Sequence, residues 1–232
     1  MPSEAASRNS CRIKVCGIRD AGEAAALDAM GIDWIGFNFH PGSARFITPE
    51  AAAPIIRGLK RSVAVGVFVD VDAARVREVA AVTGIRMAQL HGSENWDAIQ
   101  SMPLPVIKAL PHTRLADLGG LKERIRKAGS KSPSRGSSAN GPLEYLLIDT
   151  QAAKTDGFGG SGKTFDWDLL TQNPPPLPYF LAGGLGPHNL EAALQACSPF
   201  AVDLNSKVET APGRKDLSRI ETCLAILRRI PP

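Results

Sequence analysis

The segment from residue 12 to residue 39 reads RIKVCGIRDAGEAAALDAMGIDWIGFNF and alternates between two patterns. Short apolar runs at Arg12–Cys16 and Trp34–Phe39 predict two strands. The stretch between them, Ala21–Met30, is typical of a helix. A strand, a helix and a second strand in this order form the βα unit from which parallel sheets are built.

The same alternation continues to the end of the chain and predicts eight strands and eight helices. The predicted strands are Arg12–Cys16, Trp34–Phe39, Ala64–Val69, Arg86–Leu90, Val106–Ala109, Tyr145–Asp149, Tyr179–Ala182 and Ala201–Asp203. The predicted helices are Ala21–Met30, Pro49–Leu59, Asp72–Val82, Glu94–Ser101, Arg114–Ala128, Asp166–Leu170, Pro187–Ala196 and Leu217–Arg229. Thr48-Pro49-Glu50 and Gly186-Pro187-His188 are signals expected at helix starts. We therefore expect an α/β fold, a closed (β/α)₈ TIM barrel forming a single domain over residues 1–232; a doubly wound open sheet is the alternative.

Composition supports this and excludes several classes of protein. A chain of 232 residues with 44% hydrophobic residues can bury a large core, and α/β barrels commonly reach this size as one domain. The net charge of +4 could attract an anionic substrate, but no basic run suggests nucleic acid. The four cysteines have no metal-site or disulfide spacing, and no segment has the length of a signal peptide or a membrane span. We expect a cytoplasmic protein.

Two segments interrupt the pattern. Residues 1–11 are expected to form a flexible N-terminus. Residues 129–142, GSKSPSRGSSANGP after the preceding helix, have almost nothing to bury and predict a disordered insertion before the sixth strand. This insertion falls on the face of a barrel opposite the active site, so a solvated loop without function is the simplest interpretation.

Residues at the carboxyl ends of the strands are the first candidates for catalysis, because active sites of such barrels form there. Strand alternation places Arg12, Lys14 and Cys16 on one face. We expect the cations to lower the pKa of Cys16 towards neutrality and to supply a thiolate base. A cysteine on an apolar strand is otherwise more often a buried small residue.

Three further polar residues stand at strand ends: His91, Asp149 and Asp203. A carboxyl group at the lip of a barrel can have its pKa raised by desolvation, and Asp149 could then act as a general acid. Asp203 has a similar position. Both aspartates could instead be helix caps or structural hydrogen-bond acceptors.

Glycine-bearing loops predict where an anion binds. The loops after the seventh and eighth strands contain Gly183-Gly184 and Asn205-Ser206-Lys207, and these are the recurrent phosphate-binding loops of the fold. The loop Gly157–Thr164, GFGGSGKT, suits a mobile lid. It also meets the spacing of a nucleotide-binding P-loop, but no helix of normal length follows it, so we regard that interpretation as the weaker one.

Together these stretches resemble the phosphoribosylanthranilate isomerases, in the order of that family and over nearly the whole chain from Ile13 to Asp216. The matching motifs are KVCGI at 14–18, GFNFHPGSARFI at 36–47, VGVFV at 65–69, QLHG at 89–92, LIDT at 147–150, GGSGKTFDW at 159–167, AGGL at 182–185, AVD at 201–203 and PGRKD at 212–216.

The resemblance implies a role for each site residue. It makes Cys16 the general base, Asp149 the general acid and Arg45 the residue that engages an anthranilate carboxylate. His91 and Asp203 would also contact the substrate. The implied phosphate-binding residues are Gly160, Gly183, Gly184, Asn205, Ser206 and Lys207. Many relatives have glycine where this chain has Lys207, so its ammonium either adds charge to the phosphate site or faces solvent.

The resemblance also implies the reaction, an Amadori rearrangement of N-(5-phosphoribosyl)anthranilate in tryptophan biosynthesis, with no metal and no redox cofactor. The expected partner is therefore a small phosphorylated molecule, and the enzyme could be a monomer or a homodimer. The rivals are the related isomerase of histidine biosynthesis and a phosphate-binding barrel without catalysis. The first resembles a doubled half-barrel with aspartates ending strands 1 and 5, which this sequence lacks.

Overall fold

The computed structural model describes residues 11–113, 118–129, 141–149 and 167–229. Most of the predicted N-terminal segment 1–11 and of the insertion 129–142 lies outside these ranges, as does the whole glycine-rich loop Gly157–Thr164 with Gly160.

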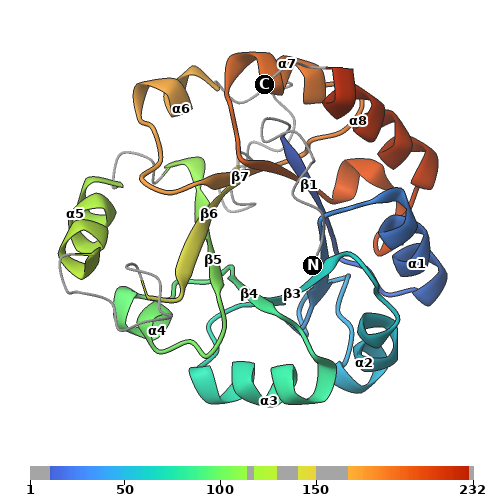
Figure 1. Ribbon diagram of the computed structural model, residues 1–232, viewed down its shortest axis with the longest axis horizontal. Helices are drawn as coiled ribbons and strands as arrows, with labels where there is room; N and C mark the ends of the chain where they lie inside the picture. Colours follow the sequence, from blue (N-terminus) through green and yellow to red (C-terminus); the bar gives the residue numbers. More distant parts are fainter. Residues whose placement is uncertain (1–10, 114–117, 130–140, 150–166, 230–232) are drawn as a thin grey trace.

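Eight parallel strands form a closed barrel at the centre of the molecule (Figure 1). They are β1 (Arg12–Cys16), β2 (Trp34–Asn38), β3 (Val63–Phe68), β4 (Met87–Leu90), β5 (Val106–Pro111), β6 (Leu143–Asp149), β7 (Tyr179–Ala182) and β8 (Ala201–Leu204). An open sheet would leave β1 or β8 with a free edge, whereas β1 pairs with both β2 and β8. The (β/α)₈ TIM barrel is thus confirmed, and the doubly wound alternative is wrong.

Helices surround the barrel and cover its outer face (Figure 1). They are α1 (Ala21–Met30), α2 (Pro49–Arg57), α3 (Ala73–Thr83), α4 (Trp96–Gln100), α5 (Leu118–Gly129), α6 (Asp168–Gln172), α7 (Leu190–Ala196) and α8 (Leu217–Arg229). The predicted start of α2 is confirmed: Pro49 is its first residue, and the Thr48 side chain accepts from the Ala51 N–H.

The predicted start of α7 at Pro187 is wrong, since the helix begins at Leu190. The Asn189 side chain accepts a hydrogen bond from the Gly186 N–H at 2.9 Å and donates one to the Gly184 carbonyl at 3.2 Å. These bonds hold the preceding residues in a turn. An asparagine that bonds to nearby backbone groups in this way competes with the helix.

A short hairpin after β8 was not predicted. Its strands, β9 (Glu209–Ala211) and β10 (Arg214–Lys215), are joined through Gly213, whose φ of +79° favours glycine. A 3₁₀ turn, η3 (Ser206–Val208), connects β8 to the hairpin. The hairpin brings Glu209 and Lys215 to the mouth of the barrel, beside Arg45 and Asn205.

The core has two layers. One lies between the sheet and the helices and includes Ile13 and Val15 of β1. The other fills the inside of the barrel with residues such as Trp34 and Phe180, whose ring centroids are 5.0 Å apart. The Arg12 guanidinium lies 5.0 Å from the Phe200 ring beside this aromatic group.

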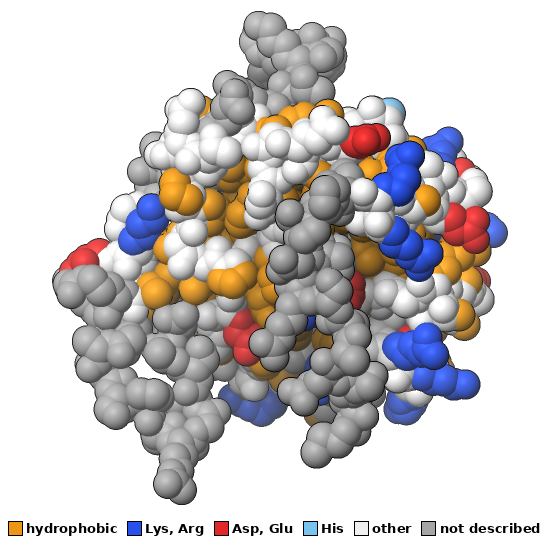
Figure 2. All heavy atoms as spheres, turned by 45° about the horizontal axis from the view of Figure 1, so that its top comes forward, with side chains coloured by type: hydrophobic (Ala, Val, Ile, Leu, Met, Phe, Trp, Pro, Cys, Tyr) orange, Lys and Arg blue, Asp and Glu red, His pale blue; other side chains and the backbone are white. Residues whose placement is uncertain are grey.

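The surface carries charges of both signs. On the face in Figure 2, Lys and Arg side chains gather towards the right and are interspersed with Asp and Glu. Within the described ranges, no helix combines the length and the apolar character needed to cross a membrane.

Asp28 of α1 fixes the connection between α2 and β3. Its carboxylate accepts hydrogen bonds from the backbone N–H groups of Lys60, Arg61 and Ser62 at 3.0, 2.9 and 2.7 Å. Burial on its own would raise the pKa of Asp28, but the three hydrogen bonds lower it to about 2. A carboxyl group whose pKa is depressed by folding stabilises the protein at neutral pH, and this contribution is lost as the pH falls through the folded pKa.

We predict that Asp28→Asn lowers the free energy of unfolding by about 2 kcal/mol at pH 7, from about 1.4 kcal/mol per unit of pKa depression. The loss should shrink as the pH falls from about 5 towards 2, because the wild-type carboxylate is then protonated as well. Urea unfolding at several pH values measures both. Asp72→Asn, which keeps the capping acceptor of α3, is the control and should cost less than about 0.5 kcal/mol. A cost for Asp28→Asn that does not change with pH contradicts the prediction.

Candidate active site

Cys16 ends β1 at the mouth of the barrel, with 6% of its surface exposed. Lys14 lies two residues before it on the same inward face and is fully buried. Its ammonium binds the Asp203 carboxylate of β8, with 2.9 Å between Nζ and Oδ2. Strand register explains this contact, since Lys14 and Asp203 are directly paired across the β1–β8 seam.

Two buried acceptors face this region without a hydrogen bond within the described part of the chain. One is Asp203 Oδ1, the oxygen not used by Lys14. The other is Gln89 Oε1 on β4, whose amide nitrogen lies 3.0 Å from His91 Nδ1. Buried acceptors are costly to leave unpaired, so both atoms are suited to bind hydroxyl groups of a ligand.

Because Gly36 has no side chain, it leaves space for the thiol of Cys16. Gly36 is paired with Cys16 across β1 and β2, and a Cβ atom at Gly36 would lie only 2.7 Å from the Cys16 sulfur. Any larger residue would displace the thiol.

The expectation that cations bring the pKa of Cys16 towards neutrality is wrong. Burial raises the pKa of this thiol above its ordinary value of 9.0, and this effect exceeds the lowering by Lys14 and Lys215. Asp203 raises the pKa further and so offsets part of the effect of Lys14. Arg12, one of the two cations invoked, is four residues earlier on β1, over the Phe200 ring.

Arg45 reaches the same region from the loop after β2. Its Nε and Nη2 atoms donate to the two carboxylate oxygens of Glu209, at 2.8 and 2.6 Å. The side chain passes over Gly17, where a Cβ atom would lie 2.5 Å from Arg45 Cδ. Gly17 also has a φ of +82°, so both its backbone and its neighbour favour glycine.

Glu209 and Lys215 are the residues that sequence reasoning missed. Lys215 is buried on β10, and its ammonium donates to Glu209 Oε1 at 2.7 Å and to Asn205 Oδ1 at 3.0 Å. The only signal was the PGRKD motif, which contains Lys215; no pattern pointed to Glu209. Asn205, expected at the phosphate site, thus uses its side-chain oxygen for Lys215.

His91 follows β4 and Asp149 ends β6, two strands further round the barrel. The two side chains approach each other, with 3.9 Å between His91 Nε2 and Asp149 Oδ2. Desolvation lowers the pKa of His91, and the nearby Asp149 carboxylate only partly opposes this. The pair therefore places a neutral imidazole beside a carboxyl group at the end of β6.

The predicted phosphate loops meet after β7 and β8. Gly183 and Gly184 have φ values of +99° and +71°, which favour glycine. The exposed Lys207 lies on η3, and its Cβ is so near Gly186 that a Cβ atom there would come within 2.9 Å. Ser206 is also exposed. The two loops are therefore in contact.

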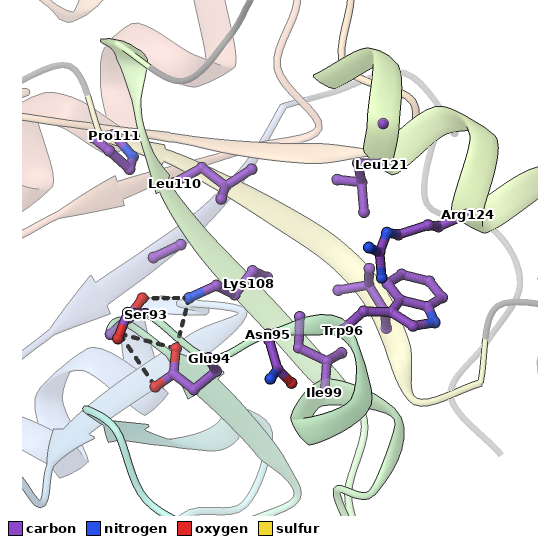
Figure 3. Close-up of a pocket in the computed structure, with 14 residues that line it drawn as sticks. Ser93, Glu94, Asn95, Trp96, Ile99, Lys108, Leu110, Pro111, Leu121 and Arg124 are labelled. Carbon is purple, nitrogen blue, oxygen red and sulfur yellow. Dashed lines mark hydrogen bonds and ion pairs between the residues drawn. The ribbon is translucent and has the colours of Figure 1, made fainter. Parts of the chain in front are cut away.

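A separate pocket of about 360 Å³ lies on the other side of β5, between that strand and helices α4 and α5 (Figure 3). Lys108 and Glu94 form a buried ion pair at its edge, with 2.6 Å between Nζ and Oε2. None of the predicted site residues lines it. Within the described residues, no group of three His, Cys, Asp or Glu side chains could hold a metal ion.

Comparison with known proteins supplies a family for this arrangement. The family model for N-(5'-phosphoribosyl)anthranilate isomerase matches residues 13–225. The chain belongs to the N-(5'-phosphoribosyl)anthranilate isomerase family. It is 36% identical to the N-(5'-phosphoribosyl)anthranilate isomerase of Magnetococcus marinus over 94% of this chain and 95% of that protein. It is 39% identical to that of Nitrosospira multiformis, over 91% and 93% of the two chains.

Solved structures of the isomerase family agree with the fold. Phosphoribosyl anthranilate isomerase from Thermotoga maritima superimposes with a TM-score of 0.79 at 31% identity, over 95% of this chain and 100% of that one. A further isomerase structure, in complex with reduced 1-(o-carboxyphenylamino)-1-deoxyribulose 5-phosphate, has a TM-score of 0.76 at 28% identity, with the same coverage.

The environment of Cys16 in this family member leads to a titration prediction. We expect the thiolate of Cys16 to form with a midpoint above the ordinary value of 9.0, so that the thiol predominates at pH 7.5. The ultraviolet absorbance of the thiolate, taken as the difference between wild type and Cys16→Ser, isolates this group from the other three cysteines. A midpoint near neutrality would show that the cations outweigh burial.

Proposed function

We propose that this chain catalyses the Amadori rearrangement of N-(5-phosphoribosyl)anthranilate to 1-(2-carboxyphenylamino)-1-deoxyribulose 5-phosphate, a step of tryptophan biosynthesis. The observation that supports this most strongly is the family match over residues 13–225. The positions of Cys16 and Asp149 at the ends of β1 and β6 agree with it.

The enzyme must bind both ends of its substrate, the anthranilate carboxylate at one end and the phosphate at the other. The Arg45 guanidinium binds the anthranilate carboxylate. The phosphate binds the backbone N–H groups of the loops with Gly183-Gly184 and Ser206, where Lys207 can add a positive charge. Asp203 Oδ1 and Gln89 Oε1 accept hydrogen bonds from sugar hydroxyls, which satisfies both unpaired atoms.

The reaction then needs one acid and one base. Asp149 donates a proton to the furanose ring oxygen, the bond from that oxygen to C1 breaks, and the aniline nitrogen forms a protonated Schiff base with C1. The positive nitrogen acidifies the C2 proton, which the Cys16 thiolate removes. The electron pair left at C2 gives an enolamine, and its tautomerisation gives the C2 ketone and a methylene at C1.

The charges around Cys16 fit a base that must ionise in a buried place. Burial raises the pKa of the thiol, and Lys14 and Lys215 are the cations that oppose this. A thiolate of high pKa is a strong base once it has formed, but only a small fraction of the enzyme molecules carry the thiolate at neutral pH. The Lys14–Asp203 ion pair keeps the thiol beside a fixed positive charge.

The sequence of β5 does not support the alternative that the chain is the related isomerase of histidine biosynthesis. That family resembles a barrel with aspartates at the ends of strands 1 and 5, whereas here β1 ends in Cys16 and β5 reads VIKALP from Val106 to Pro111. The charged residue of β5, Lys108, is the third of its six residues and forms an ion pair with Glu94.

We further infer that the enzyme acts in the cytoplasm, on a small phosphorylated substrate, as a monomer or homodimer. One solved Thermotoga maritima relative is described as a monomer generated from a dimeric phosphoribosylanthranilate isomerase.

The proposal predicts turnover of freshly prepared phosphoribosylanthranilate, followed as loss of its fluorescence. Cys16→Ala and Asp149→Asn should each lower kcat by at least about 100-fold while substrate binding is largely kept, because acid and base groups act mainly in the transition state. Cys223→Ala, which alters a buried thiol of α8 away from the mouth, is the matched control and should keep kcat within about twofold.

Two outcomes contradict the proposal. Absence of turnover by the wild type would leave a phosphate-binding barrel without catalysis. A Cys16→Ala variant with more than about a tenth of the wild-type kcat would remove the thiol from its role as base.

A further inference from the structure

Glu209 is the residue on which two cations of the barrel mouth converge. Its Oε1 atom accepts hydrogen bonds from Arg45 Nε, Lys215 Nζ and the Gly213 N–H, at 2.8, 2.7 and 3.1 Å. Its Oε2 atom accepts from Arg45 Nη2 at 2.6 Å. Only 4% of the side chain is exposed. Burial raises the pKa of Glu209, but these donors lower it below its ordinary value, so the group is a carboxylate at neutral pH.

The backbone of the β9–β10 hairpin fixes the position of the Glu209 carboxylate. Glu209 begins β9 and Lys215 ends β10, and the two are paired in the register of the hairpin. Gly213 makes the turn between them and donates its own N–H to the carboxylate. The position of Glu209 is therefore set by the backbone as well as by Lys215.

The contact with Arg45 is directional. A guanidinium held through Nε and Nη2 lies in the plane of the carboxylate, which fixes its orientation as well as its position. The Nη1 atom makes no hydrogen bond in the described part of the chain, and 21% of the Arg45 side chain is exposed. Contact of Arg45 Cδ with Gly17 restricts the rest of the side chain.

The charges leave a place for one more anion. Arg45 and Lys215 contribute two positive charges and Glu209 one negative charge, so this ion cluster has an excess of one positive charge. A buried or half-buried excess charge is costly unless a partner meets it. A carboxylate on the substrate supplies that partner at the one edge of Arg45 that Glu209 does not occupy.

We propose that Glu209 is a positioning residue for carboxylate recognition: it orients the Arg45 guanidinium towards the carboxylate of the substrate, and Lys215 holds Glu209 in place. The inference rests on the proposed function, in which Arg45 binds the anthranilate carboxylate. Glu209 itself touches no reacting atom. Its effect should therefore appear only with ligands that have the carboxylate.

The test compares two non-reacting ligands by calorimetry. One is reduced 1-(o-carboxyphenylamino)-1-deoxyribulose 5-phosphate, and the other is its phenylamino counterpart without the carboxylate. Glu209→Gln should weaken binding of the first by about tenfold or more, as expected for a disturbed charge-assisted contact, and should change binding of the second by less than about twofold. In steady-state assays the same variant should raise KM for phosphoribosylanthranilate more than it lowers kcat.

A double-mutant cycle shows whether Glu209 acts through Arg45. In an Arg45→Ala background, Glu209→Gln should add less than about a twofold further loss, because the group it orients is gone. Glu191→Gln is the matched control, since Glu191 forms an exposed ion pair with Arg229 on the surface. This control should leave both affinities unchanged.

Three results would overturn the inference. Equal losses for both ligands would mean that Glu209 only maintains the fold of the mouth. Unchanged or tighter binding of the carboxylate ligand would mean that Glu209 is idle or competes with the substrate for Arg45. Full additivity with Arg45→Ala would mean that the two residues act separately. Wild-type protein that binds neither ligand would instead count against the proposed function.

If Glu209→Gln does not fold, as judged by its unfolding transition, Glu209→Asp provides the second variant. It keeps the charge but shortens the side chain by one methylene group, which moves the carboxylate away from Arg45. It should therefore weaken binding of the carboxylate ligand selectively, and an equal loss for both ligands would again contradict the inference.

Discussion

The ion pair between Lys14 and Asp203 is the interaction on which the site depends. It joins the first and last strands of the barrel, where direct pairing of the two residues brings their side chains together inside the seam. Each is buried, so neither charge could remain without the other; loss of one partner of such a pair typically costs about 3–5 kcal/mol. The pair can form only if the barrel closes in the correct register. The contact that accompanies closure of the barrel therefore also supplies the charged residues at the base of its mouth.

The charges at the mouth fit the anionic substrate and the thiol base that we propose. Lys14, Arg45 and Lys215 give three positive charges, and Asp203 and Glu209 give two negative ones. The excess of one positive charge can be met by a substrate carboxylate or by an ionised Cys16. The phosphate of the proposed substrate carries further negative charge, for which the backbone N–H groups of the loops after β7 and β8 are suited.

Much of this could be predicted from the sequence, because the fold follows from local patterns. Apolar runs located all eight strands, and alternation placed Arg12, Lys14 and Cys16 on the face opposite to Ile13 and Val15, which pack in the outer layer of the core. The pKa of Cys16 was predicted in the wrong direction, since alternation says which side chains share a face but not how strongly burial opposes their charge. Glu209 was missed because its partner Arg45 is 164 residues away and only the closed barrel brings them together. The roles of the site residues stay predictions: Cys16, Asp149, Arg45, His91, Asp203 and the residues of the phosphate loops.

A crystal structure of the protein with reduced 1-(o-carboxyphenylamino)-1-deoxyribulose 5-phosphate would show directly how the barrel mouth holds its ligand. We expect the ligand carboxylate to contact Arg45 and the phosphate to contact the loops after β7 and β8. We also expect C2 of the sugar chain to lie within about 4 Å of the Cys16 sulfur, close to the separation needed for reaction. A ligand bound with its carboxylate away from Arg45, or with C2 out of reach of Cys16, would rule out the roles proposed for these two residues.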